Sequence, residues 1–119
     1  MKDLKYFKRS EFNCKCKCGR GAELMDDAFL LKLDKAREIS GVPYNINSGY
    51  RCVKHNLEIG STSNNHISGK AVDIKATTGQ ERLHILSGLI KSGFKRIGIA
   101  KNFIHVDDMD KVESCWLYS

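Results

Sequence analysis

Two residues of one short stretch, His66 and Asp73, carry side chains that could bind a metal ion together. His66 follows a polar loop at residues 61–65, and such loops lie on the surface and often carry function. Asp73 stands in the alternating stretch 70–75, where strand propensity disfavours an aspartate unless it has a compensating partner. Gly69 allows a sharp backbone turn between the two. Their spacing leaves two interpretations open, metal ligation or a strand-edge aspartate bonded to loop amides.

A second stretch, residues 103–107, adds His105 as a third candidate ligand. Side chains alternate across a strand, so Phe103, His105 and Asp107 are expected on one face. Two interpretations are open for His105 and Asp107. Either both side chains ligate a metal, or one is a ligand while the other orients that ligand or acts as a base. Two histidines and one carboxylate, with a fourth position left to water, are typical of catalytic zinc rather than of a closed structural site. Zinc in such a site would acidify a water molecule and polarise a carbonyl.

The two other histidines are expected to play different parts. His84 lies within a helical pattern and is predicted to be a partly exposed helix residue. His55 follows Arg51 by four residues, which one helical turn would place on a common face. A packing or ligand-orienting role is therefore expected for His55.

Five cysteines are many for 119 residues. The odd number and the lack of a secretory signal argue against a full disulfide framework. The alternating cysteines near the N-terminus lack the CxxC spacing of a zinc knuckle. Three interpretations stay open: reduced thiols packed near one another, a disulfide, or a second metal site. The cysteines are Cys14, Cys16, Cys18, Cys52 and Cys115.

Hydrophobic periodicity predicts two principal helices. Residues 25–40 repeat apolar side chains at three- and four-residue intervals, and Gly41 ends this pattern. A capping box at residues 78–81 opens a second helix, which Gly93 ends. The apolar residues of this second helix are Leu83, Leu86, Leu89 and Ile90.

The remaining elements are mostly short strands. Residues 1–23 are expected to form an extended or irregular arm with a cysteine cluster. Helices come early and in the middle while strands gather late, which predicts an α+β fold with a mainly antiparallel sheet, in one domain of residues 1–119. The predicted strands are 44–47, 70–75, 96–100, 103–106 and 116–118, with a short helix at 53–59.

Charge and composition limit the classes of partner. The net charge of +6 and the pI near 9.1 allow an attraction to anionic polymers, but the basic residues are scattered and no stacking aromatics accompany them. We therefore expect no specific nucleic-acid binding. No run approaches the roughly 18 apolar residues of a membrane helix, and residues 1–12 lack the apolar core of a signal peptide. We expect a monomer made in the cytoplasm. Two locations stay open: the protein remains there, or it leaves by another route such as cell lysis or delivery within a phage particle.

Three motifs follow one another along the chain: SGYR at 48–51, HxxGxAxD at 66–73 and IHVD at 104–107. Together they resemble the zinc D-Ala-D-Ala carboxypeptidase family. That family includes bacterial DD-carboxypeptidases, dipeptidases of vancomycin resistance and phage endolysin peptidases, and it shares its fold with hedgehog signalling domains. The resemblance covers residues 10–118 and implies a hedgehog/DD-peptidase-like fold in a short single-domain member.

The resemblance also implies a role for individual residues. Arg51 matches an arginine that binds and orients substrate, a task suited to a fixed guanidinium fork. Ser48 and Tyr50 flank it and are expected to line the substrate pocket. The implied ligands of a single zinc ion (Zn2+) are His66, Asp73 and His105.

One departure from the family concerns the general base. Many members have an acidic residue three positions before the last zinc histidine, where this chain has Asn102. Asn64 likewise stands where a serine often precedes the first zinc histidine. Asp107 is the first substitute for the base and Asp108 the second. An acid–base group contributes about a hundred- to ten-thousand-fold to the rate, so this position decides activity.

The sequence thus predicts a zinc metallopeptidase that hydrolyses peptidoglycan stem peptides, as a carboxypeptidase or as an endopeptidase of the endolysin type. The alternative is a zinc-bearing binding or structural module of a phage or cell-wall assembly, with weak or no catalysis. A basic nucleic-acid-binding module with a structural metal site is a third hypothesis.

Overall fold

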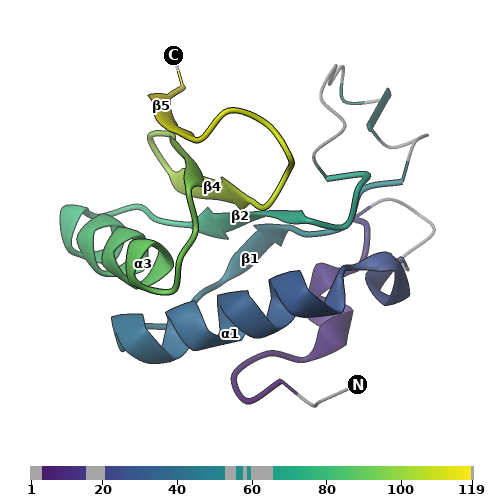
Figure 1. Ribbon diagram of the computed structural model, residues 1–119, viewed down its shortest axis with the longest axis horizontal. Helices are drawn as coiled ribbons and strands as arrows, with labels where there is room; N and C mark the ends of the chain where they lie inside the picture. The colour runs from purple at the N-terminus through teal and green to yellow at the C-terminus, as the bar shows by residue number, and fades with distance from the viewer. Residues whose placement is uncertain (1–3, 16–20, 53–55, 58, 60–65, 119) are drawn as a thin grey trace.

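Five strands form one sheet in the order β1-β2-β4-β3-β5, and two helices lie beside it (Figure 1). The computed structural model describes residues 4–15, 21–52, 56–57, 59 and 66–118. Three of the four strand pairings are antiparallel, whereas β5 runs parallel to β3. The predicted α+β fold is therefore confirmed. The elements are α1 (Asp27–Ser40), β1 (Ile46–Ser48), β2 (Ala71–Lys75), α3 (Gly79–Lys91), β3 (Arg96–Ile99), β4 (Phe103–Asp107) and β5 (Ser114–Leu117).

Local capping sets the ends of both helices. Asp26 accepts a hydrogen bond of 2.9 Å from the amide of Phe29, so α1 begins two residues later than predicted. Gly41 ends α1 with a left-handed φ of 71°, which glycine adopts without strain. Thr78 caps α3 in the same way, with its hydroxyl accepting from the amide of Glu81 at 3.1 Å.

The two helices pack against each other through a point of close approach. A Cβ atom at Gly88 of α3 would lie 2.5 Å from the carbonyl oxygen of Ala36 in α1. The Tyr44 hydroxyl donates to the carbonyl oxygens of Ala36 and Ile85 at 3.3 and 3.2 Å. Burial raises the pKa of Tyr44 to about 12. Tyr44 therefore belongs to this contact, and β1 starts later than the predicted strand at 44–47.

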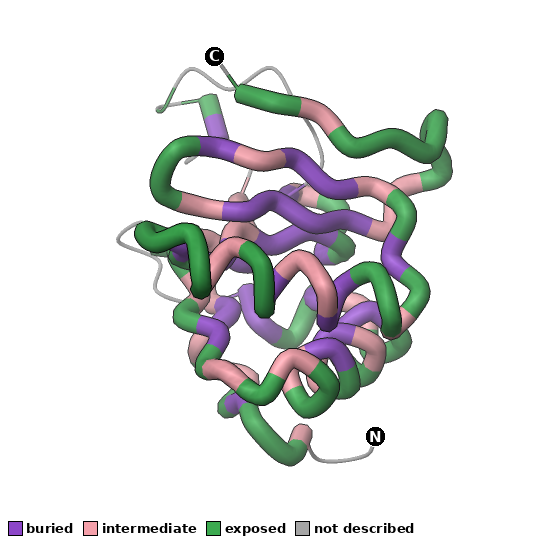
Figure 2. The backbone as a smooth tube through the Cα atoms, turned by 90° about the vertical axis from the view of Figure 1, so that its left-hand side faces the viewer, coloured by how far each residue is buried: buried purple, intermediate pink, exposed green. Residues whose placement is uncertain are grey.

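One face of the sheet is apolar and packs against the two helices. Residues of β2 and β4 are mostly buried there (Figure 2). Alternate residues of β2 and β4 join the core with the buried side of the helices, so the residues between them point to the opposite face. On α3 the buried side chains are Ile85 and Leu89, whereas Leu83 and Ile90 are more than half exposed. The strand residues in the core are Val72, Ile74, Ile97, Ile104 and Val106.

The N-terminal segment is more ordered than the predicted arm. It contains two 3₁₀ helices, η1 (Arg9–Phe12) and η2 (Ala22–Leu24), and Phe12 is fully buried in the core. The amide of Tyr50 donates to the carbonyl of Phe12 at 2.8 Å. This contact ties the segment to the chain that follows β1.

The predicted short helix at 53–59 lies largely outside the described residues, as do the positions of His55, Asn64, Cys16 and Cys18. Among the residues that the structure does describe, no helix has the length and apolar character needed to cross a membrane.

Candidate metal centre

One row of cross-strand neighbours crosses the sheet on the face turned away from the helices. Asp73 of β2 lies opposite His105 of β4, and His105 lies opposite Gly98 of β3. The row continues to Ser48 of β1 on one side and to Trp116 of β5 on the other. Neighbours of this kind are about 5 Å apart, so strand register alone brings these side chains together.

His66 reaches the same place from the turn that precedes β2. Gly69 in this turn has a φ of 78°, a conformation that side-chain-bearing residues rarely adopt. A Cβ atom there would also collide with the carbonyl oxygen of Leu24, and the amide of Asp26 donates to the Gly69 carbonyl at 2.9 Å. The expected sharp turn between His66 and Asp73 is thus held against the start of α1.

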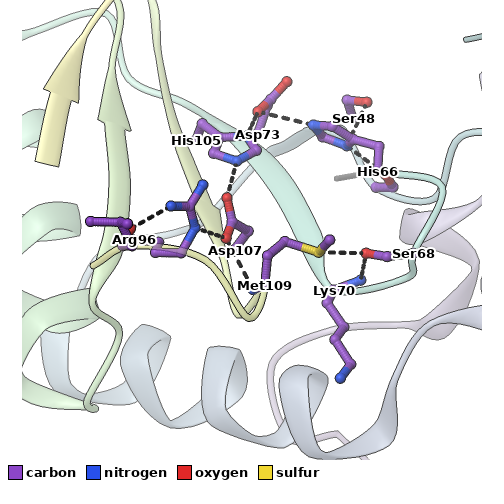
Figure 3. Close-up of polar contacts among 11 residues, drawn as sticks. Ser48, His66, Ser68, Lys70, Asp73, Arg96, His105, Asp107 and Met109 are labelled. Atoms are coloured by element: carbon purple, nitrogen blue, oxygen red, sulfur yellow. Dashed lines mark hydrogen bonds and ion pairs between the residues drawn. The ribbon is translucent and has the colours of Figure 1, made fainter. Parts of the chain in front are cut away.

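The side chains of His66, Asp73 and His105 converge on one point (Figure 3). One ligand atom from each lies within 4.8 Å of the others. The Asp73 Oδ1 atom is 3.4 Å from His66 Nε2 and 2.9 Å from His105 Nδ1. Two imidazole nitrogens and one carboxylate oxygen are a donor set that zinc binds in open, catalytic sites. The residues present therefore fit a zinc ion.

In each of the two histidines, the ring nitrogen that faces away from Asp73 donates a hydrogen bond to an oxygen of the protein. His66 Nδ1 donates to the carbonyl of Gly49 at 2.8 Å, and His105 Nε2 donates to Asp107 Oδ2 at 2.7 Å. A proton held on these outer nitrogens leaves the lone pairs of the inner nitrogens directed at the shared centre. Such partners orient metal-bound histidines and make them better ligands.

Electrostatics ties the three ligand residues together. Burial by itself would raise the pKa of Asp73, but hydrogen bonds from His105 and His66 outweigh it, and the pKa is lowered. Burial would lower the pKa of His105, whereas its bonds to Asp107 and Asp73 raise it above the ordinary value. Asp73 is therefore ionised at neutral pH, and the raised pKa of His105 means that a metal ion competes with a proton for its Nδ1 atom.

Asp107, the predicted base, lies on the far side of His105 from Asp73 (Figure 3). It is fully buried, and its Oδ1 accepts from Arg96 Nε at 2.6 Å and from the amide of Met109 at 3.1 Å. Burial opposes its ionisation, but these bonds and that from His105 lower its pKa. This is the geometry of a carboxylate that orients a ligand, one of the two roles left open by the sequence. Its role as base stays a prediction.

Asp108, the second substitute for the base, and Asn102, at the position of the family's usual base, flank β4 in sequence. Asp108 forms an ion pair of 3.0 Å with Lys32 of α1. Asn102 is exposed in the turn between β3 and β4, where its carbonyl accepts from the amide of Ala76 at 2.9 Å. An asparagine side chain at this position takes up no proton at neutral pH.

Arg51 lies beside the ligand set on the β1 side. Its Nη2 donates to Ser48 Oγ at 3.1 Å, and its Nη1 donates to Asn56 Oδ1 at 3.1 Å. Ser48 Oγ is also 3.4 Å from His66 Nδ1, so one hydroxyl connects the guanidinium to a candidate ligand histidine. The ring of Tyr50 packs on Gly21 and the core, and its pocket-lining role stays a prediction.

An aromatic wall of three rings, Phe103, Trp116 and Tyr118, borders the site on its β5 side. The Trp116 and His105 ring centroids are 5.7 Å apart, and Tyr118 lies 6.3 Å from Trp116 and 5.4 Å from Phe103. Gly98 makes room for these rings, since a Cβ there would be 2.5 Å from Trp116 Nε1. This aromatic wall was not predicted from the sequence. The available signal was the spacing of Trp116 and Tyr118, since residues two apart in a strand lie on one face.

Arg96 was also missed by sequence reasoning. Besides Asp107 it bonds the carbonyl of Val112 at 2.6 Å and lies 5.1 Å from the ring centroid of Trp116. Its place opposite Asp107 depends on the pairing of β3 with β4. His84 is exposed on α3, as predicted.

Comparison with known proteins agrees with the site. A family model described as Peptidase M15 matches residues 5–107, a range that holds all three candidate ligands and Arg51. No curated protein matches the chain. The matched family consists of zinc D-Ala-D-Ala carboxypeptidase-like enzymes, which implies a metallopeptidase with a peptide substrate. The chain belongs to the peptidase M15 family.

Proposed function

We propose that this protein is a zinc metallopeptidase that hydrolyses stem peptides of peptidoglycan. The observation that carries the proposal is the convergence of His66, Asp73 and His105 within 4.8 Å, with Arg51 tied to His66 through Ser48. A metal site and a group for binding a substrate carboxylate or carbonyl thus stand side by side. The net charge of +6 supports an anionic polymer such as the bacterial wall as the target.

A bound zinc ion would supply Lewis-acid activation of water and of the scissile carbonyl. The protein's own residues would hold and orient the partners. Asp107 keeps His105 in the ligating tautomer, and the carbonyl of Gly49 does the same for His66. Arg51, held by two hydrogen bonds, presents a preorganised guanidinium to an anionic or developing negative oxygen of the substrate.

A second candidate function is a zinc-bearing binding module with weak or no hydrolysis. Two observations favour it: Asn102 occupies the position of the usual acidic base, and both oxygens of Asp107 already accept hydrogen bonds. Loss of a general base costs about a hundred- to ten-thousand-fold in rate. A protein with this defect would still hold zinc and a peptide.

Zinc content and peptidoglycan digestion separate the two functions. We expect one zinc per chain, and soluble products from purified peptidoglycan that disappear when a chelator such as 1,10-phenanthroline is added. Released D-alanine would identify a carboxypeptidase, and cleaved crosslinks an endopeptidase. One zinc per chain without chelator-sensitive products would instead support the binding module.

Matched histidine variants test the ligand assignment in the same assays. His66→Ala should lose both zinc and products. His84→Ala, which changes an exposed helix residue, should keep both. A His66→Ala protein that still holds one zinc per chain would overturn the proposed site.

A further inference from the structure

Cys14 and Cys52 are 38 residues apart in sequence, yet their sulfur atoms lie 3.7 Å from each other. The Cys14 sulfur also accepts a hydrogen bond of 3.4 Å from the amide of Cys52. Cys14 is 2% exposed, whereas Cys52 is half-buried. A disulfide bond is about 2.0 Å long, so the two sulfurs need to approach by less than about 2 Å to form one.

The backbone around the two cysteines is already held together. The Tyr50 amide bonds to the Phe12 carbonyl at 2.8 Å, two residues before each cysteine. Gly49 packs directly against the backbone of Phe12, since a Cβ atom at residue 49 would lie 2.6 Å from the Cα of Phe12. Because these contacts do not involve sulfur, side-chain rotation is the main movement that bond formation requires.

We propose that Cys14 and Cys52 are a redox-active pair that oxidised glutathione, or another small disulfide, converts to an intramolecular disulfide. The more exposed Cys52 thiolate attacks a sulfur of oxidised glutathione, forming a mixed disulfide and releasing one glutathione thiolate. The Cys14 thiolate then attacks the Cys52 sulfur and releases the second glutathione. In total, two protein thiols give up two protons and two electrons, and oxidised glutathione becomes two reduced molecules.

The disulfide bond would join the N-terminal segment covalently to the segment that carries Arg51, the expected substrate-binding residue. Cys52 follows Arg51, whose amide donates to the carbonyl of His66 at 3.3 Å. A disulfide that closes a loop of this length should raise the thermal midpoint by roughly 10 °C. It should also hold Arg51 more firmly and change the KM for the peptide substrate. Only this effect on KM rests on the proposed function.

The test uses the full chain with the substitutions Cys16→Ser, Cys18→Ser and Cys115→Ser, which retains only the two cysteines of the pair. After oxidation with glutathione disulfide, we expect an intact mass lower by two hydrogen atoms and no thiol titratable in denaturant. Trypsin should release residues 10–15 joined to residues 52–54. Dithiothreitol should restore both thiols and lower the thermal midpoint again.

Two matched measurements complete the test. Adding Cys14→Ser to this background should abolish the intramolecular bond and leave a glutathione adduct on Cys52. Peptide mapping of the oxidised wild-type chain gives the same answer if the multiple variant does not fold. These readouts depend on mass and thiol content, so they succeed or fail independently of peptidase activity.

Three outcomes would overturn the proposal. The first is a pair of thiols that stays titratable in denaturant after oxidation. The second is a wild-type peptide map in which Cys14 or Cys52 is joined to a different cysteine. The third is two zinc ions per wild-type chain with one lost in the Cys14→Ser, Cys52→Ser variant, which would make the pair metal ligands instead.

Discussion

The Nε2 atom of His105 donates a 2.7 Å hydrogen bond to Asp107, which is fully buried. The other ring nitrogen of His105 points to Asp73, so the imidazole is held between two carboxylates. Arg96 holds the second oxygen of Asp107 in turn. The orientation of His105, a candidate metal ligand, therefore depends on Asp107 of β4 and on Arg96 of β3.

Asp107→Asn should weaken zinc binding by about 10- to 100-fold, because it removes the charged acceptor that orients His105. Competition with a chromophoric chelator measures this affinity. Asp110→Asn, which changes an exposed aspartate of the following loop, is the matched control and should bind zinc like the wild type. An Asp107→Asn protein with unchanged zinc affinity and lost turnover would support the base role of Asp107 instead.

Zinc affinity should fall as the pH drops through the raised pKa of His105, because zinc and the proton compete for Nδ1. The ordinary pKa is 6.5, so the loss should begin above pH 6.5, with about tenfold weaker binding per further pH unit from this one group. Measuring the apparent zinc affinity across the neutral range checks this. A transition centred below pH 6.5 would contradict it.

Stability of the zinc-free protein should have the opposite dependence on pH. A raised folded-state pKa means that protonated His105 contributes stability below the unfolded-state pKa, and that this contribution is lost as pH rises through the folded-state value. Chelated protein should therefore lose this contribution as the pH rises above about 6.5 and through the raised pKa of His105. Urea unfolding with and without zinc measures it, with His105→Gln as the control that should lack this part of the dependence.

Ser48→Ala should raise the KM for a stem peptide by roughly fivefold, since one hydrogen bond to Arg51 contributes about 1 kcal/mol. The zinc content should stay at one per chain, because the ligands remain. Ser40→Ala is the control: it also removes a serine hydrogen bond, but at the end of α1. Equal KM values for the two variants would show that Ser48 does not position Arg51.

Gly88→Ala should destabilise the fold by about 1–3 kcal/mol, because the new methyl group would lie 2.5 Å from the backbone oxygen of Ala36. The gain in helix propensity from glycine to alanine, about 1 kcal/mol, is too small to offset this clash. Gly79→Ala, at the open start of α3, has nothing within 4 Å of the new atom and should be neutral or stabilising. Thermal unfolding of both variants checks the contrast.

The sequence by itself determined the features that depend on neighbouring residues. Alternation placed His105 and Asp107 on one strand face, because successive side chains point to opposite sides of a strand. The capping box at residues 78–81 marked the start of α3, since a cap bonds an amide only a few residues away. Resemblance to a known family added the candidate ligand set and the expected role of Arg51.

Only the tertiary structure decided how these pieces meet. The register of β2 on β4 put Asp73 opposite His105, and β3 brought Arg96 to Asp107. The apolar residues of α3 lie on more than one side, so packing on α1 selected Ile85 and Leu89 for the core. The approach of Cys14 to Cys52 likewise joins distant segments. Such contacts depend on which surfaces pack together, and no local pattern of residues encodes that choice.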